Sequence, residues 1–154
     1  MIIVSNTTPI LSLYKIGKLD LLKALFDQVL IPTAVFNEIN IIGKKGYNVL
    51  NTVEYVKVKN IQNTLAADLL QSQLDYGEAE AIVLARELKA DILILDEKKA
   101  RKIAQTTSQT VIGTIGILQL AKNKGLICDM RTNLDSLIEE GIWIDKKLYH
   151  CKRA

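Results

Sequence analysis

The chain has 154 residues, of which 49% are hydrophobic and 24% charged, with a formal net charge of +3 and a pI near 8.8. These values are typical of a soluble globular protein and exclude a disordered or collagen-like chain. The two cysteines have no metal-ligand spacing, and no apolar run approaches the roughly 20 residues that cross a bilayer. We therefore expect a cytoplasmic protein that has neither a disulfide framework nor a membrane segment.

The first half of the chain predicts short buried strands that each lead into a helix. Residues 2–5 form an apolar strand, and Pro9 suits the first turn of a helix that Gly17 ends. A second helix is expected over residues 19–26, a strand over 29–31 and a helix from Pro32 to Ile39. A loop over residues 43–46 and a strand over 55–58 follow.

The second half continues this alternation around its clearest strand, residues 92–95, which is apolar at every position as central parallel strands are. Asp75 and Glu78 have the spacing of a capping box and open a helix that runs to Lys89. The remaining expected elements are helices over 98–104, 113–124 and 134–140 and a strand over 111–112. Strands alternating with helices predict a three-layer α/β/α fold with a central parallel sheet of four to five strands. We expect one domain over residues 1–154, in which the tail, 129–154, has the weakest pattern.

Five polar residues lie where a parallel sheet collects functional groups, beyond the carboxyl ends of its strands. Asn6 follows the first strand and Asp96 the fourth, so they share one crevice if these strands are neighbours. Glu78 and Glu80 begin the helix before the fourth strand, and Glu38 lies on the helix after the second. Carboxylates brought together without cations would stay partly protonated, and a divalent cation removes this penalty. The pattern favours a Mg²⁺ or Mn²⁺ site and phosphodiester hydrolysis.

Each of these residues also has a structural interpretation. Asn6 is typical of a turn or an N-cap, and Glu38 lies at the edge of an apolar helix face, where it could be solvated. Glu78 could only complete the capping box, and Glu80 could only offset the helix dipole. Asp96, at the end of a wholly apolar strand, is hardest to explain in this way, and the convergence of all five favours function.

The mildly basic charge permits a nucleic-acid partner and also suits many metabolic enzymes. Lys98, Lys99 and Arg101 begin the helix directly after Asp96, where they could contact backbone phosphates without reading sequence; the alternative is a solvated helix face. Residues 113–116 could direct amides toward a phosphate at a helix N-terminus, or could serve tight packing of the helix on the sheet.

Several segments stand in a recognisable order and spacing: residues 3–10 with 18–22, Ile31-Pro32 with Val35 and Glu38, then 74–82, 95–101 and 112–118. Through them the chain resembles the PIN-domain family, especially the VapC-type toxin ribonucleases and a PIN-like branch with Ser-Asn-Thr-Thr-Pro and Gly-Glu-Ala-Glu-Ala motifs. The resemblance covers most of the chain up to about Ile127. It implies a PIN-like fold, a Mg²⁺- or Mn²⁺-dependent ribonuclease activity on RNA and often a toxin role with a cognate antitoxin, and it makes a homodimer plausible.

Residue by residue, the resemblance gives Asn6 the place of the usual first aspartate, Glu38 the second acidic place and Asp96 the last. Spacing back from Asp96 favours Glu78 for the third place. Glu-Ala-Glu also resembles a motif of flap endonucleases, a related fold, in which both glutamates approach the metals. Because Glu78 and Glu80 point about 200° apart on an ideal helix, both could serve only if the helix begins irregularly.

Asn6 is the departure from the family pattern, because an amide oxygen can bind Mg²⁺ but brings no negative charge. If the weakened site still binds metal, the chain is an endoribonuclease; if not, it is an RNA-binding or regulatory protein. An unrelated phosphotransfer or hydrolase domain is a distant third, since the chain lacks an Asp-x-Asp pattern and phosphate-loop glycines. Thr7 or Thr8 resembles the hydroxyl residue that supports the first acidic place, and Thr7 is also a candidate RNA-binding residue.

Overall fold

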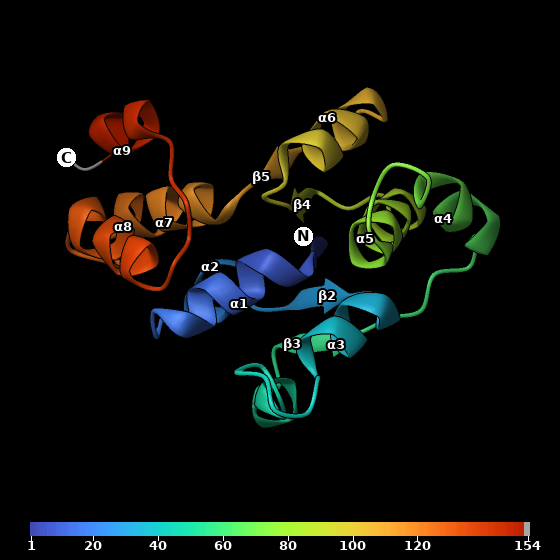
Figure 1. Ribbon diagram of the computed structural model, residues 1–154, viewed down its shortest axis with the longest axis horizontal. Coiled ribbons are helices and arrows are strands. Elements are labelled where there is room, and N and C mark those ends of the chain that lie inside the picture. Colours follow the sequence, from blue (N-terminus) through green and yellow to red (C-terminus); the bar gives the residue numbers. More distant parts are fainter. Residues whose placement is uncertain (153–154) are drawn as a thin grey trace.

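The computed structural model describes residues 1–152 and is built on a five-stranded, all-parallel sheet (Figure 1). The strands are β1 (Ile3–Ser5), β2 (Val29–Ile31), β3 (Val56–Val58), β4 (Ile92–Ile94) and β5 (Val111–Ile112), in the spatial order β3-β2-β1-β4-β5. The helices are α1 (Thr7–Lys15), α2 (Leu21–Phe26), α3 (Thr33–Ile39), α4 (Thr64–Leu70), α5 (Tyr76–Glu87), α6 (Lys98–Thr106), α7 (Thr114–Asn123), α8 (Met130–Glu139) and α9 (Lys146–Lys152), with a 3₁₀ helix, η1 (Val49–Thr52). The predicted α/β class and parallel sheet are confirmed.

Both faces of the sheet are covered, because alternate residues of each strand point to opposite sides. Ile3 and Ile94 pack in one buried cluster with residues of α1, α2, α7 and α8. Val4 and Leu93 pack in a second cluster with residues of α5 and α6. The continuous apolar run at residues 92–95 is thus explained by burial on two sides.

The strand order reverses at β1, which pairs with β2 on one side and with β4 on the other. Ser5 is in register with Ile94, and the backbone N–H of Asn6 donates to the carbonyl of Ile94 at 3.0 Å. The first and fourth strands are therefore neighbours, as the crevice between Asn6 and Asp96 requires. Such a reversal of strand order is where open parallel sheets bind their ligands.

Helices α4 and α9 were not predicted, and α8 begins earlier than expected. In α4, Leu65 and Leu69 are both 67% exposed, so the helix shows little inward-facing periodicity, and Asn63 caps it by accepting from the amide of Ala66. Helix α8 begins at Met130, four residues earlier than expected, because the carboxylate of Asp129 accepts from the amide of Thr132 at 2.7 Å. Each of these two helices thus begins at a residue whose side chain accepts from one of the first helical amides, which have no partner within the helix.

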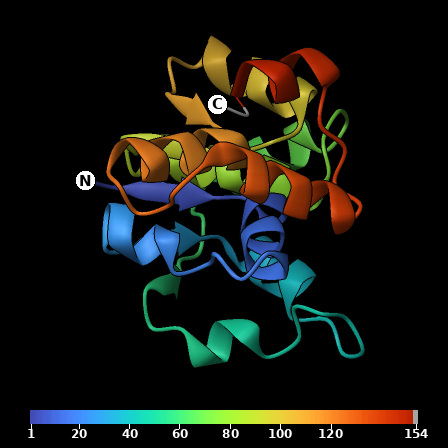
Figure 2. The ribbon, with the colours of Figure 1, turned by 90° about the vertical axis from the view of Figure 1, so that its left-hand side faces the viewer.

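The C-terminal helices α7, α8 and α9 gather at one end of the molecule, away from α4 (Figure 1), and Figure 2 views the molecule from the side on which they lie. Helix α8 packs on α7, and α9 packs on α8. Among residues 1–152, no helix is long and apolar enough to cross a membrane.

Candidate active site at the ends of the strands

Asn6 lies at the end of β1, in the N-cap position of α1, and is only 3% exposed. Its side chain makes no capping hydrogen bond, and Oδ1 accepts none from any residue between 1 and 152. A buried acceptor left without a partner costs about 1–3 kcal/mol, so the N-cap interpretation does not account for this side chain. An oxygen that ligates a cation would account for it.

Glu38 reaches from α3 to the first turn of α5. Its Oε1 accepts from the amide of Gly77 at 2.9 Å, and its Oε2 accepts from the hydroxyl of Thr7. Gly77 leaves the space for this approach, because a Cβ atom there would lie 2.6 Å from Oε1. Glu38 is therefore held in place rather than solvated, and the hydroxyl of Thr7 supports this acid.

Glu78 completes the predicted capping box of α5. The Asp75 carboxylate accepts from the amide of Glu78 at 2.8 Å, and the Glu78 carboxylate accepts from the amide of Asp75 at 3.2 Å. Burial raises the pKa of Glu78 above its ordinary value, and the negative charges of Asp75, Glu97 and Glu38 raise it further, against a lowering by the hydrogen bond from Asp75. Glu78 is thus both a helix cap and an acid crowded by other acids.

Glu80 is as buried as Glu78, each being 8% exposed, but it faces a different element. Its Oε1 accepts from the amide of Ala34 at 3.0 Å, in the first turn of α3. The N-cap of α3 is Pro32, whose side chain has no acceptor, so Glu80 supplies the missing cap. Because α5 begins as a regular helix at Tyr76, Glu78 and Glu80 diverge by about 200° around it.

Asp96 follows β4 and is held by the N-terminus of α7. Its Oδ1 accepts from the amide of Thr114 at 2.6 Å, and its Oδ2 accepts from the hydroxyl of Thr114, also at 2.6 Å. Gly113 permits this contact, because a Cβ atom there would lie 2.6 Å from Oδ1 of Asp96. The Thr114 amide that could have met a phosphate is thus occupied by a carboxylate. Gly116 fits the packing alternative, since a Cβ atom there would lie 3.3 Å from Cβ of Ile112.

Two cavities receive the four acidic side chains, and Asn6 lines neither of them. The first, of about 470 Å³, is lined by Glu78, Asp96, Glu97 and Arg101 and by part of the C-terminal region; we call it the β4 cavity. The second, of about 460 Å³, is lined by Glu38 and Glu80 with residues of α3 and with Tyr76; we call it the α3 cavity. Across residues 1–152, no three Asp, Glu, His or Cys side chains lie close enough as a group to hold a metal ion.

The basic candidates lie on the first turns of α6. Lys98 and Lys99 are exposed, whereas Arg101 is half-buried and lines the β4 cavity. None of the ion pairs formed within residues 1–152 includes these three side chains. Positive charge near the start of a helix opposes the helix dipole by about 0.3–1 kcal/mol, so helix stability does not explain them.

The family model described as a PIN domain matches residues 2–152 of the chain. The chain belongs to the PIN-domain family. This match confirms the resemblance to the PIN-domain family and the PIN-like fold. It also covers the tail, whereas the resemblance found in the sequence extends only to about Ile127. PIN domains are generally nucleases and usually use divalent metal ions. No curated protein matches the chain.

Sequence reasoning missed the residues that hold the acids of this PIN domain in place. Gly77 carries a signal, because glycine inside a helix costs about 0.5–1 kcal/mol relative to alanine and is therefore placed there for space. Thr114 and Glu97 carry none that is specific: the first follows a glycine at a helix start, and the second is an N-cap whose Oε2 accepts from the amide of Ala100 at 2.7 Å. Their roles depend on tertiary contacts.

Proposed function

We propose that this PIN-domain protein is a Mg²⁺- or Mn²⁺-dependent endoribonuclease and the toxin of a toxin–antitoxin pair. The observation that carries the proposal is the buried, unpartnered Oδ1 of Asn6, at the strand end beside the one that Asp96 follows. The candidate ligands are all oxygen donors, which suit Mg²⁺ and Mn²⁺ better than softer ions. The proposal takes residues 1–154 as one cytoplasmic domain with RNA and an antitoxin protein as partners; these last points rest on the family resemblance.

We assign Asn6, Glu38, Glu78 and Asp96 as the residues that would hold the metal, and Glu80 as the support of α3. Because the three acids of this set do not lie close enough together to hold an ion as the structure places them, metal binding requires their side chains to move. When bound, a divalent ion offsets the charge of the crowded carboxylates and supplies the activation of water that phosphodiester hydrolysis needs. The chain itself orients the ligands, because Thr7 and the amide of Gly77 hold Glu38 while Thr114 holds Asp96. Such outer contacts fix the direction of a ligand's lone pairs.

Lys98, Lys99 and Arg101 are proposed to bind the RNA backbone next to the site. They carry no compensating acidic partner within the described part of the chain, and they follow Asp96 by two to five residues. Contacts of this kind hold a strand in position without reading its sequence. Thr7, whose hydroxyl is engaged by Glu38, would act on RNA only through that carboxylate.

The test is cleavage of a mixed RNA pool by the purified protein across Mg²⁺ and Mn²⁺ concentrations. Metal-dependent cleavage is expected, and Asp96→Asn should reduce it by more than about 100-fold, since even residues that only orient ligands contribute 10–100-fold. Glu139→Gln, a matched change of an exposed acid at the end of α8, should cleave as the unaltered chain does. Cleavage that persists in Asp96→Asn would remove Asp96 from the site.

A second function, RNA binding or regulation without catalysis, is favoured by two features of the same site. Asn6 brings no charge, and both oxygens of Asp96 are already engaged by Thr114. This function predicts RNA binding that weakens steeply with salt and no cleavage at any metal concentration. Asn6→Asp separates the two, because restoring a carboxylate should tighten Mn²⁺ binding if Asn6 is a ligand. An unchanged Mn²⁺ affinity would argue against that role.

A further inference from the structure

The β4 cavity has an apolar side that the nuclease proposal does not use. Beside Glu78, Asp96 and Arg101, it is lined by side chains from the end of α8, the connecting segment 142–145 and α9: Leu137, Ile142, Trp143, Ile144 and Leu148. Trp143 is the single tryptophan of the chain and is 81% exposed. An aromatic side chain left in solvent beside a candidate active site is a candidate contact for a ligand.

The backbone around Trp143 is fixed where α8 ends. Gly141 adopts a φ of +85°, the left-handed conformation that closes a helix. Its amide donates to the carbonyl of Ile138 at 2.9 Å, and the amide of Ile142 donates to the carbonyl of Leu137 at 3.0 Å. This pair of bonds is a Schellman motif, and it sets the direction in which the chain leaves α8.

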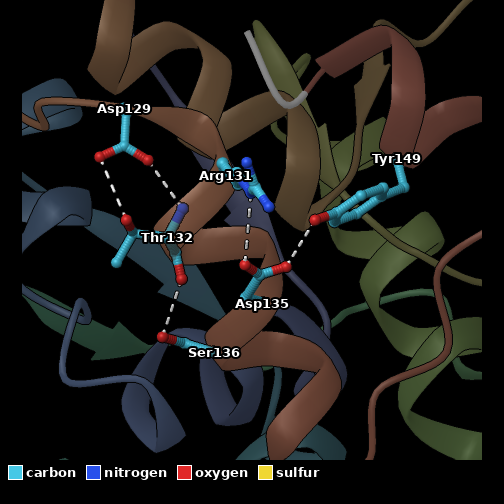
Figure 3. A network of polar contacts seen from close by, with 6 residues as sticks. All are labelled: Asp129, Arg131, Thr132, Asp135, Ser136 and Tyr149. Atoms are coloured by element: carbon cyan, nitrogen blue, oxygen red, sulfur yellow. Dashed lines mark hydrogen bonds and ion pairs between the residues drawn. The ribbon is translucent and has the colours of Figure 1, made fainter.

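The segment is also fixed where α9 begins. Oδ1 of Asp145 accepts from the amide of Lys147 at 2.8 Å. Tyr149 then ties α9 back to α8, because its hydroxyl donates to Asp135 at 2.7 Å, and Asp135 also pairs with Arg131 at 3.9 Å (Figure 3). With both ends held, the backbone that carries Trp143 is fixed before any ligand arrives.

Trp143 is exposed between two neighbours that pack against the core. Ile142 and Ile144 are partly buried and pack against the main hydrophobic cluster, whereas Trp143 between them is exposed. Ile142, Trp143 and Ile144 all line the β4 cavity. The two isoleucines thus anchor the segment to the core, while the ring of Trp143 stays in contact with the cavity and with solvent.

We propose that Trp143 is the stacking platform for an unpaired base of single-stranded RNA, in the same cavity in which Glu78 and Asp96 act and in which Arg101 meets the backbone. The inference rests on the proposed function, since it names the form of RNA that this site accepts. Stacking uses the face of a base, and this face is accessible when the base is unpaired or splayed from a helix.

RNA is the occupant that the cavity favours over a protein segment. The cavity is continuous from the carboxylates to Trp143, so a ligand reacting at the acidic side extends along the apolar side. Its volume of about 470 Å³ lies within the range of small-ligand pockets, about 300–1,000 Å³. A tryptophan for the base and an arginine for the phosphate are the two groups that single-strand binding combines.

The test uses Trp143 as its own reporter, because the chain has no other tryptophan. A single-stranded oligoadenylate is titrated into the full chain with Mg²⁺ present, on a time scale shorter than cleavage, and tryptophan emission is recorded together with the anisotropy of a labelled strand. Saturable quenching is expected with the single strand. Much weaker quenching is expected with an oligoadenylate–oligouridylate duplex, or with a strand of equal charge in which abasic sites replace the bases.

Substitutions then separate stacking from general binding. Trp143→Leu should weaken single-strand binding by about 5- to 150-fold, the range measured for removal of one stacked aromatic, and Trp143→Phe should recover part of it. Tyr47→Leu, an aromatic of 41% exposure that does not line the cavity, is the matched control and should bind normally. Because Trp143 is exposed, its variants should unfold at the temperature of the unaltered chain.

Several outcomes would overturn the inference: a strand that binds by anisotropy without quenching Trp143, equal affinity of Trp143→Leu, equal response to abasic and normal strands, or no binding of any strand. A change of Trp143 emission with a co-purified protein partner but not with RNA would instead identify a protein-docking face. The cleavage assay with Asp96→Asn tests the proposed function separately. Quenching without cleavage would keep the stacking site and reject catalysis, and cleavage without quenching would do the reverse.

Discussion

Two cavities flank the first turn of α5, and they use the same residue type differently. In the α3 cavity, Glu80 satisfies the amide of Ala34 at the start of α3, so its carboxylate serves the fold. In the β4 cavity, burial raises the pKa of Glu78, and the negative charges of neighbouring acids raise it further. Two glutamates separated by one residue thus have different environments, because their side chains point about 200° apart around a regular helix.

Gly77 lies between Tyr76, which lines the α3 cavity, and Glu78, which lines the β4 cavity. The carboxylate of Glu38, which lines the α3 cavity, crosses to the amide of Gly77 and comes close enough to Glu78 to raise its pKa. Glu38 of α3 is thus held against the first turn of α5, which carries Glu78. Contacts of this kind bring together candidate ligands that are far apart in sequence. Whether the α3 side belongs to the metal site can therefore be tested at this glycine.

The largest effect on metal binding is expected from Gly77→Ala, which tests whether the α3 cavity contributes a ligand to the metal site. The added methyl group would overlap the Glu38 carboxylate and displace it, so Mn²⁺ affinity and cleavage should fall by about 10–100-fold. Stability should change little, because alanine gains about 0.5–1 kcal/mol in a helix and offsets part of the lost hydrogen bonding. Calorimetric Mn²⁺ titration and thermal unfolding measure the two effects.

Gly116→Ala is the matched control for stability, since it also adds a methyl group inside a helix. That methyl group would lie 3.3 Å from Cβ of Ile112, a tight contact that needs a shift of only a few tenths of an ångström. If Gly77→Ala binds Mn²⁺ as the unaltered chain does, Glu38 is not a ligand. The proposed metal site would then consist of Asn6, Glu78 and Asp96.

A smaller effect, on stability, is expected at Glu80. Glu80→Ala leaves the Ala34 amide without its acceptor in a buried position and should lower the free energy of unfolding by about 1–3 kcal/mol. Glu80→Gln keeps an acceptor oxygen and should preserve both folding and cleavage. Urea denaturation and the RNA-pool assay give the two readings. A Gln variant that folds normally but no longer cleaves would show that Glu80 acts on the metal, as the Glu-Ala-Glu resemblance to flap endonucleases implies.

The sequence predicted the parts of this arrangement that depend on local patterns. The all-apolar run at 92–95 indicated a central strand, and the spacing of Asp75 and Glu78 indicated a capping box. The strand ends indicated a shared crevice for Asn6 and Asp96 on the condition that their strands are neighbours, and the structure pairs these strands. These inferences hold because periodicity, capping and parallel pairing are short-range or topological rules.

The partners of the acids could not be predicted in the same way. The contact between Glu80 and Ala34 joins residues 46 apart in sequence and depends on how α3 packs against α5. The backbone position of Trp143 depends on the end of α8 and on the hydrogen bond by which Tyr149 ties α9 to α8. Side-chain direction is set by such tertiary contacts, whereas residue type and spacing only limit the choices.

The smallest effect on stability, a change in its pH dependence, is expected from Glu78→Gln. This variant removes a charge from the β4 cavity but keeps a side-chain oxygen that can accept from the amide of Asp75. Since the pKa of Glu78 is raised in the folded state, the folded protein binds more protons than the unfolded chain between the unfolded pKa, about 4.3, and the higher folded pKa. The free energy of unfolding of the unaltered chain should therefore fall as the pH rises through this window. In Glu78→Gln this fall should shrink, whereas the exposed-site control Glu139→Gln should keep it.

Urea denaturation at a series of pH values, with and without Mn²⁺, measures this dependence. A cation bound at Glu78 favours the ionised form, so saturating Mn²⁺ should remove the fall in the unaltered chain and leave Glu78→Gln less affected. Parallel pH profiles for the two proteins without metal would show that Glu78 is not crowded by Asp75, Glu97 and Glu38 as the structure places it. A Mn²⁺ response equal in both would instead assign the metal to ligands other than Glu78, and the contrast between the two cavities would then rest on Asp96 alone.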